Sequence, residues 1–357
     1  MEKEEDKLSI LMFPWLAHGH IFPFLELAKL LSKRNFNIYF CSTAVNLDSI
    51  RKSIEKDTTS DIDSNSIKLV QLHIPETPQL PPQLHTTKNL PSNLLQVLLQ
   101  AFQNSSSSFS DIMNCLKPDM LIYDFFQPWA PKLALSQGIP SVYFATSGAT
   151  PFSFFHHLFA NGTSSTFPYQ AIYLLDYEKE IRARILANIK DADKNFAFGN
   201  FEMSSDIVLV KSCRGVEGKY IDYLSILCKK QIVPTGPLVN DNEEEEEEDI
   251  HSDIMEWLRG KDEHSTVYIS FGSEYFLSET QIEQVAKGLE LCNANFVWVI
   301  RFPLGEKRNN IEDVSKAREL SEKMKKTREQ EAAEVAEQLS RLCVKYKQQK
   351  LTSIETL

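Results

Sequence analysis

Short apolar runs alternate with amphipathic stretches along the first two thirds of the chain. The apolar, β-type runs cover residues 8–13, 37–41, 67–72, 120–123, 141–144 and 206–210. Helical spacing of apolar residues follows Pro23, a residue that a first helical turn tolerates, and recurs at 91–115, 127–137, 147–161 and 216–227. Continuous apolar strands separated by helices are typical of a parallel sheet with both faces covered. We therefore predict an α/β fold.

A change of composition divides the chain into two units. Residues 231–238 are rich in Pro and Gly, and the acidic run at 241–249 follows them. Like charges repel and keep such a segment extended, so it forms no core. The strand and helix pattern then resumes with helices at 252–259 and 278–291 and strands at 266–271 and 296–301. We predict an N-terminal domain at 1–237, an acidic linker at 238–250 and a smaller domain at 251–303.

The end of the chain is rich in Lys and Glu and has a third pattern. Apolar residues recur there every three or four positions, as at Val335, Leu339, Leu342 and Tyr346. We predict amphipathic helices within 304–357. A second domain with so few strands would leave apolar strand edges uncovered at 296–300, unless these helices fold back over them.

Charge and composition exclude several classes of partner. The formal net charge is −11, but eight negative charges lie in 241–249, which leaves about −3 for the rest. Because no basic stripe is present, we expect no nucleic-acid partner. No apolar run approaches the ~20 residues that span a bilayer, and the charged N-terminus lacks a signal sequence, so we expect no membrane partner and a cytoplasmic location. The six cysteines have no C-x-x-C spacing, which indicates free thiols.

Two histidines and an aspartate fall where an open α/β sheet places its reactive groups. His18 and His20 follow the first strand, and Asp124 follows the strand at 120–123. The carboxyl ends of parallel strands meet at one edge of the sheet. An imidazole there can accept a proton near neutral pH if a carboxylate fixes its other nitrogen. The same residues are also compatible with an ordinary structural role, and His156 and His157 are expected to be partly exposed on a helix.

Other chemistries find less support. His18 and His20 lack a third ligand at zinc spacing, so no metal is expected. The chain contains neither the G-x-S-x-G of a nucleophile elbow nor the G-x-G-x-x-G of a dinucleotide site. Small residues end a strand at Ser270-Phe-Gly-Ser273, where backbone amides could approach a phosphate or form an ordinary turn.

Four segments resemble the plant family-1 UDP-glycosyltransferases. They are Phe13-Pro-Trp-Leu-Ala-His-Gly-His-Ile-Phe-Pro23, Tyr123-Asp-Phe-Phe-Gln-Pro-Trp-Ala130, Pro234-Thr-Gly-Pro237 and Ser265-Thr-Val-Tyr-Ile-Ser-Phe-Gly-Ser273. The resemblance runs from about residue 9 to 303 and is similar in detail to the branch that extends the sugar of an existing glycoside, often through a 1,6 linkage. It implies the GT-B fold, in which one Rossmann-like domain binds the acceptor and a second binds the UDP-sugar.

The resemblance also implies roles for individual residues. His20 would be the general base that deprotonates the acceptor hydroxyl, with Asp124 as its orienting partner. The implied donor-binding residues are Thr146, Gly272 and Ser273, and the implied acceptor-binding residues are His18, Phe125 and Phe126. UDP-glucose would be the co-substrate, and neither a cofactor nor a metal is implied.

The sequence departs from the family after the strand at 296–301. Family members continue there into further strand and helix units that hold the nucleotide sugar, whereas Phe302-Pro-Leu-Gly-Glu-Lys-Arg308 leads directly to the terminal helices. We therefore expect a truncated second domain with weak or lost UDP-sugar binding. One hypothesis is an inverting hexosyltransferase, for glucose, that acts on small hydrophobic glycosides. The other is a non-catalytic form, from an internal deletion or an incorrect gene model, that retains acceptor binding and pairs with a full-length relative.

Overall fold

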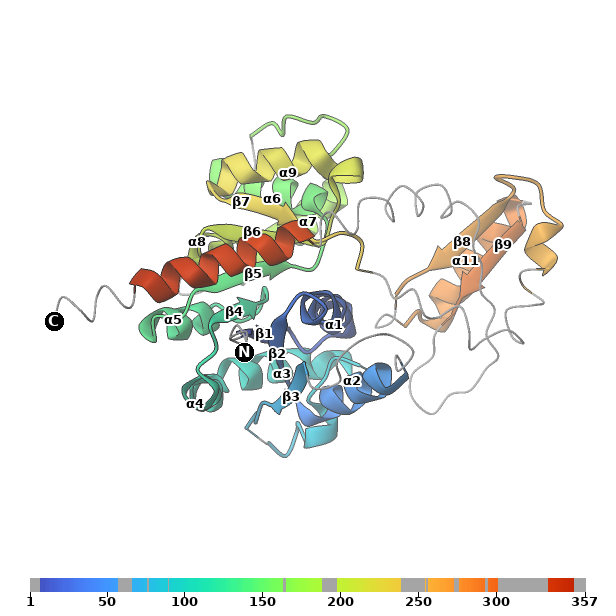
Figure 1. Ribbon diagram of the computed structural model, residues 1–357. Helices are drawn as coiled ribbons and strands as arrows, with labels where there is room; N and C mark the ends of the chain where they lie inside the picture. Colours follow the sequence, from blue (N-terminus) through green and yellow to red (C-terminus); the bar gives the residue numbers. More distant parts are fainter. Residues whose placement is uncertain are drawn as a thin grey trace.

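A computed structural model of the protein comprises a large α/β unit, a small two-stranded unit and a C-terminal helix (Figure 1). The structure describes residues 7–56, 66–162, 165–187, 198–238, 254–272, 276–292, 295–300 and 333–349, apart from Glu76, Asn89 and Met255. Most of the predicted acidic linker, and the terminal helices predicted before residue 333, lie outside these residues.

A seven-stranded parallel sheet forms the centre of the large unit. Its strands are β1 (Leu8–Phe13), β2 (Phe36–Ser42), β3 (Ile67–Gln71), β4 (Met120–Tyr123), β5 (Ser141–Ala145), β6 (Ile207–Val210) and β7 (Gln231–Pro234). The spatial order is β3-β2-β1-β4-β5-β6-β7, so the direction of winding reverses between β1 and β4. Ligands of open α/β sheets bind at such a reversal, beyond the carboxyl ends of the strands. Every residue of β4, β5 and β6 is buried, which explains their continuous apolar sequences.

Helices cover both faces of this sheet. The described helices of this unit are α1 (His18–Ser32), α2 (Ala44–Lys56), α3 (Leu95–Gln103), α4 (Ser106–Leu116), α5 (Trp129–Ser136), α6 (Ala149–Asn161), α7 (Asp176–Ala187), α8 (Gly199–Met203) and α9 (Arg214–Cys228), with short 3₁₀ turns at Pro82–Leu84 and Ser92–Leu94. Alternate residues of the strands point to opposite faces of the sheet and belong to two hydrophobic cores. α1 and α2 pack on one face, and α3 to α6 with α8 and α9 pack on the other.

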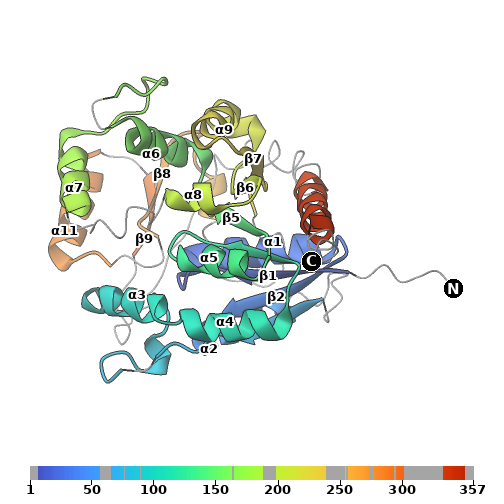
Figure 2. The same ribbon diagram turned by 90° about the vertical axis from the view of Figure 1, so that its left-hand side faces the viewer.

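The C-terminal helix, residues 333–349, packs on the same face as α1 and α2. Its buried stripe consists of Val335, Ala336, Leu339, Leu342 and Cys343. Figures 1 and 2 draw this helix in red beside the large unit and away from β8 and β9. The helix therefore completes the core of the large sheet and does not cover the small unit.

The small unit contains β8 (Thr266–Ser270), α11 (Glu279–Cys292) and β9 (Asn295–Val299), with a short helix at 254–259. β8 and β9 form a parallel pair. Val267 and Tyr268 are 46% and 54% exposed, and Phe296 is 39% exposed. These three apolar side chains thus remain accessible, as expected for a sheet with few strands, whereas Val297 of β9 is 2% exposed.

The structure differs from the sequence-based expectation at three elements. No strand was predicted at residues 231–234, within the Pro- and Gly-rich segment, yet they form the edge strand β7, where the terminal proline needs no partner for a missing N–H. α1 begins at His18, so Pro23 lies inside the helix and not in its first turn. The helix predicted at 91–115 is two helices, α3 and α4, separated at 104–105.

None of the described helices combines the length and the apolar composition needed to cross a bilayer.

Candidate active site

His20 and Asp124 meet at the point where the winding of the sheet reverses. His20 lies in the first turn of α1, directly after β1, and Asp124 follows β4, the neighbour of β1. The Nδ1 atom of His20 is 2.8 Å from Oδ2 of Asp124. The His20 side chain is 25% exposed, whereas that of Asp124 is fully buried. The structure therefore brings together the two residues that the sequence singled out, with only the histidine open to solvent.

Backbone contacts fix the carboxylate of Asp124. Its Oδ2 atom accepts a hydrogen bond from the Trp15 N–H at 2.9 Å, and Oδ1 accepts one from the Phe125 N–H at 2.7 Å. A carboxylate held in this way accepts a hydrogen bond from Nδ1–H of His20 and favours the tautomer that leaves the lone pair on Nε2. This arrangement gives the imidazole a basic nitrogen opposite its anchored one.

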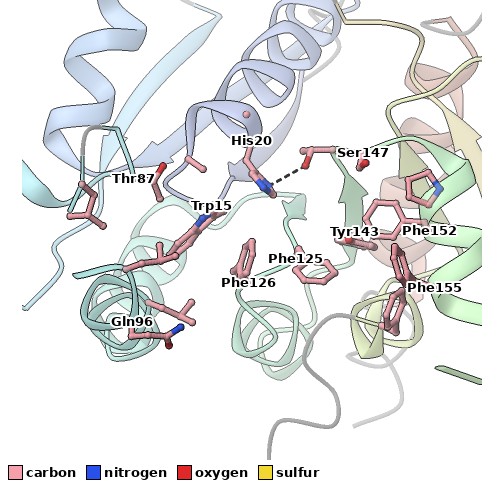
Figure 3. A pocket seen from close by; sticks show the side chains of 18 of the residues that line it. Trp15, His20, Thr87, Gln96, Phe125, Phe126, Tyr143, Ser147, Phe152 and Phe155 are labelled. Atoms are coloured by element: carbon pink, nitrogen blue, oxygen red, sulfur yellow. Dashed lines mark hydrogen bonds between the residues drawn. The ribbon is translucent and has the colours of Figure 1, made fainter. Parts of the chain in front are cut away.

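Thr146 adds a hydroxyl to the same cluster. It follows β5, which pairs with β4, and its Oγ1 atom is 3.1 Å from Nδ1 of His20. Three successive positions of the sheet, β1, β4 and β5, thus each contribute one polar side chain at their carboxyl ends. Figure 3 shows a hydrogen bond of the His20 ring, toward the side of the cavity where Ser147 lies, as a dashed line.

A carboxylate from α9 holds the loop that carries Thr146. Glu217 accepts hydrogen bonds from the N–H groups of Ala149 and Thr150, both at 2.9 Å, and from the Ser212 hydroxyl. It therefore caps the N-terminus of α6, where free N–H groups favour a negative charge. Burial alone would raise the pKa of Glu217, but the hydrogen bonds from Ser212, Thr150 and Ala149 outweigh it and lower that pKa.

A cavity of about 1380 Å³ opens in front of this cluster. His20 and Thr146 form part of its wall, and much of the rest is aromatic, including Trp15, Phe125, Phe126, Phe152 and Phe155 (Figure 3) and also Phe198. Phe276, which precedes α11 in the small unit, also lines it. A cavity of this size and lining suits an apolar small molecule that exposes one hydroxyl to His20.

The remaining site residues named from the sequence have different positions. Phe125 and Phe126 line the cavity, and the Phe126 ring lies 5.8 Å from that of His20. His18 is not among the lining residues, and its ring packs edge-on against Phe22 at 5.2 Å. Gly272 follows β8 with a φ of 84°, a conformation that glycine adopts without strain. Ser273 lies outside the described residues.

Sequence reasoning missed several features of the site. Tyr143 and Gln96 line the cavity, and Glu217 caps α6, but none of them belongs to a recognisable motif. His156 and His157, expected to be partly exposed, are 6% and 5% exposed because α6 packs against α9 and α8 on both sides. Among the residues that the structure describes, no group of three or more His, Cys, Asp and Glu side chains could hold a metal ion.

Comparisons with known proteins concern the chain as a whole. Residues 6–240 match the family model "Glycosyltransferase, N-terminal domain". The chain is 45% identical over 309 residues to a mogroside IIIx synthase of Siraitia grosvenorii, covering 85% of this chain and 67% of the relative. It is also 45% identical over 301 residues to a β-D-glucosyl crocetin β-1,6-glucosyltransferase of Gardenia jasminoides, covering 83% and 66%.

A solved structure supports the same assignment of the fold. It is a Glycyrrhiza uralensis UDP-glycosyltransferase in complex with glycyrrhetinic acid 3-O-monoglucuronide, with a TM-score of 0.64 and 20% identity over 91% of this chain and 67% of that one. The α/β fold predicted from the sequence is thereby confirmed as GT-B with a reduced second unit. The chain spans about two thirds of the length of the curated relatives that it matches. It belongs to the family-1 UDP-glycosyltransferases of plants.

Proposed function

We propose that the chain binds a small hydrophobic glycoside in the cavity beside His20 and transfers a hexose, glucose, to it from a UDP-sugar. The observation that carries the proposal is the 2.8 Å contact between Nδ1 of His20 and the buried carboxylate of Asp124 at the cavity wall. The names of two relatives, a mogroside synthase and a β-1,6-glucosyltransferase of glucosyl crocetin, support an acceptor that already bears a sugar.

The chemistry follows from the arrangement of the base. Nε2 of His20 takes the proton of an acceptor hydroxyl as that oxygen attacks the anomeric carbon of the donor. The bond from the anomeric carbon to the diphosphate oxygen breaks on the opposite face, so UDP leaves with its electron pair and the configuration inverts. Asp124 stabilises the imidazolium that forms, and the aromatic lining excludes water from the attacking oxygen.

The proposed organisation places acceptor binding in residues 1–237, an acidic linker at 238–250, a partial donor-binding domain at 251–303 and terminal helices at 304–357. Thr146, Gly272 and Ser273 are the proposed donor contacts, and Phe125 and Phe126 are the proposed acceptor contacts. An acceptor contact at His18, which does not line the cavity, stays a prediction from the sequence. The exposed Gly272 after β8 is consistent with a close backbone approach to a diphosphate.

A second candidate function is acceptor binding without transfer. It is supported by the small unit, in which one parallel strand pair leaves Val267 and Tyr268 accessible, and by the length of the match to the relatives. In this form the chain holds the glycoside but lacks contacts that retain UDP-glucose, and it pairs with a full-length relative to complete the site.

Calorimetric titration with UDP-glucose and a glucosyl-transfer assay distinguish the two. Under the first proposal the chain binds UDP-glucose, and His20→Ala lowers turnover about 10²- to 10⁴-fold because the base is lost. His73→Ala, at an exposed histidine after β3, is the matched control and leaves turnover unchanged. Acceptor binding with neither donor binding nor turnover supports the second candidate. Turnover that survives His20→Ala contradicts the role of His20.

A further inference from the structure

The polar side chains of the cavity wall are distributed unequally between two halves. Figure 3 shows Thr87 and Gln96 on one side of His20, and Phe152 and Phe155 on the opposite side. The first, the α3 half, comes from the segment before α3 and from α3 itself, and the second, the α6 half, comes from α6. All the lining residues that α6 contributes have apolar side chains. The two halves therefore offer different surfaces to a bound molecule.

Gln96 is the polar residue of the α3 half that remains available to a ligand. It lies in the first turn of α3 and is exposed. Within the part of the chain that the structure describes, its carboxamide makes no hydrogen bond. Thr87 is already engaged, since its N–H and its hydroxyl lie 3.0 and 3.4 Å from the backbone oxygen of Leu16. A carboxamide has two N–H donors and an acceptor oxygen, which match the neighbouring hydroxyls of a hexose.

The α3 half is fixed relative to the catalytic pair. The Trp15 N–H donates to Oδ2 of Asp124 at 2.9 Å, and the Trp15 ring packs edge-on against Phe102 of α3 with ring centroids 4.9 Å apart. The segment between β1 and α1 thus contacts both the helix that carries Gln96 and the carboxylate that anchors His20. A sugar held by Gln96 therefore has a defined position relative to the proposed base.

The α6 half suits the aglycone of a glycoside. A hexose against Phe152 and Phe155 would exchange its hydrogen bonds to water for contacts with apolar carbon, which is unfavourable. An apolar aglycone gains from the same contact, because the Phe155 side chain is 38% exposed in the free protein. Of the two polar lining residues that precede α6, Thr146 is a proposed donor contact and Ser147 directly follows it. A glycoside thus fits the cavity with its sugar toward α3.

We propose that Gln96 is a specificity-determining residue, whose carboxamide binds hydroxyls of the sugar that the acceptor already bears. This inference rests on the proposed acceptor site and deepens it, since it assigns one half of the cavity to the sugar and the other to the aglycone. Leu95 and Leu99, which also line the α3 half, contact the C–H face of that sugar. The hydroxyl that His20 deprotonates then belongs to the sugar, and the product is a glycoside with a longer sugar chain.

Equilibrium dialysis of a flavanone 7-O-glucoside and of its 7-hydroxyflavanone aglycone, without donor, tests this assignment. Gln96→Leu is expected to weaken binding of the glucoside about 5- to 30-fold, the effect of losing one or two uncharged hydrogen bonds, and to leave binding of the aglycone unchanged. Gln100→Leu is the matched control. Gln100 lies one turn later on α3, is also exposed and does not line the cavity, so its replacement leaves the binding of both ligands unchanged.

Phe155→Ala tests the orientation of the ligand. It is expected to weaken binding of the glucoside and of the aglycone by the same factor, because both place the flavanone against α6. Equal weakening of both ligands by Gln96→Leu, or unchanged binding of the glucoside, overturns the inference but leaves the proposed acceptor site intact. Weakening of the glucoside alone by Phe155→Ala also overturns it. Binding of neither ligand by the unaltered chain contradicts the acceptor site itself, and the inference falls with it.

Discussion

The contact between Gly148 and Glu217 allows a double-mutant cycle whose outcome can be worked from the structure. A Cβ atom at Gly148 would lie 2.8 and 2.9 Å from the two carboxylate oxygens of Glu217, closer than real Cβ contacts allow. Gly148→Ala must therefore displace the carboxylate that caps α6 through Ala149 and Thr150. Hydrogen bonds to a charged group contribute about 1.5–3 kcal/mol each, and the lower end applies to a half-buried carboxylate.

We expect Glu217→Ala and Gly148→Ala each to lower the free energy of unfolding by about 2–3 kcal/mol, since both remove the same cap. In the Glu217→Ala background, the carboxylate that would clash with a Cβ atom at position 148 is absent. Gly148 has φ −67° and ψ 163°, which alanine adopts readily, so Gly148→Ala there is neutral or stabilises by up to about 1 kcal/mol. The coupling energy of the cycle is therefore about 2–4 kcal/mol.

Urea denaturation followed by circular dichroism measures all four proteins. The pH dependence of stability is a second test of the cap formed by Glu217. The pKa of Glu217 lies below its ordinary value of 4.5, so its contribution is present above about pH 4.5 and is lost as the pH falls through the folded-state pKa. The difference between the unaltered chain and Glu217→Ala should shrink over that range. If Gly148→Ala costs the same in both backgrounds, the steric and capping explanation is wrong.

Two further predictions concern the C-terminal helix and the thiols. Leu339 is fully buried, so Leu339→Ala should lower the free energy of unfolding, measured by urea denaturation, by about 2–5 kcal/mol. Val344 is 48% exposed, so the control Val344→Ala should change that free energy by less than about 0.5 kcal/mol. Equal effects of the two substitutions would argue against packing of the helix on the sheet. Burial raises the pKa of Cys343 to about 12, so its thiol is protonated near pH 8. Iodoacetamide at that pH should therefore alkylate the exposed Cys115 and Cys292 and leave Cys343 unmodified until the chain unfolds, which mass spectrometry measures.

The sheet and the central pair of the site could be anticipated because both depend on local sequence. Strands such as 120–123 are buried on both faces and read as unbroken apolar runs. His20 and Asp124 follow two such strands, and parallel strands bring their carboxyl ends to one edge whatever the loops between them do. The assignments of His20 and Asp124 as catalytic residues nevertheless remain proposals.

Features that depend on distant partners could not be anticipated in the same way. Glu217 looks like any helical glutamate, and the two backbone N–H groups that it binds lie 67 and 68 residues away. Tyr143 lies in an apolar run where its ring fits, and only the structure shows that its hydroxyl has no hydrogen-bond partner among the described residues. The strand Gln231–Pro234 was missed because Pro and Gly follow it closely, and an edge strand can end in proline.

The C-terminal helix packs in the same core as β1, so the small unit is an insertion between two parts of the large unit. No described residue of the small unit belongs to the seven-stranded sheet or to its two cores. A complete donor-binding domain from a relative could therefore be inserted between β7 and the C-terminal helix without disrupting a strand pairing. The large unit is thus suited to the construction of chimeric glycosyltransferases.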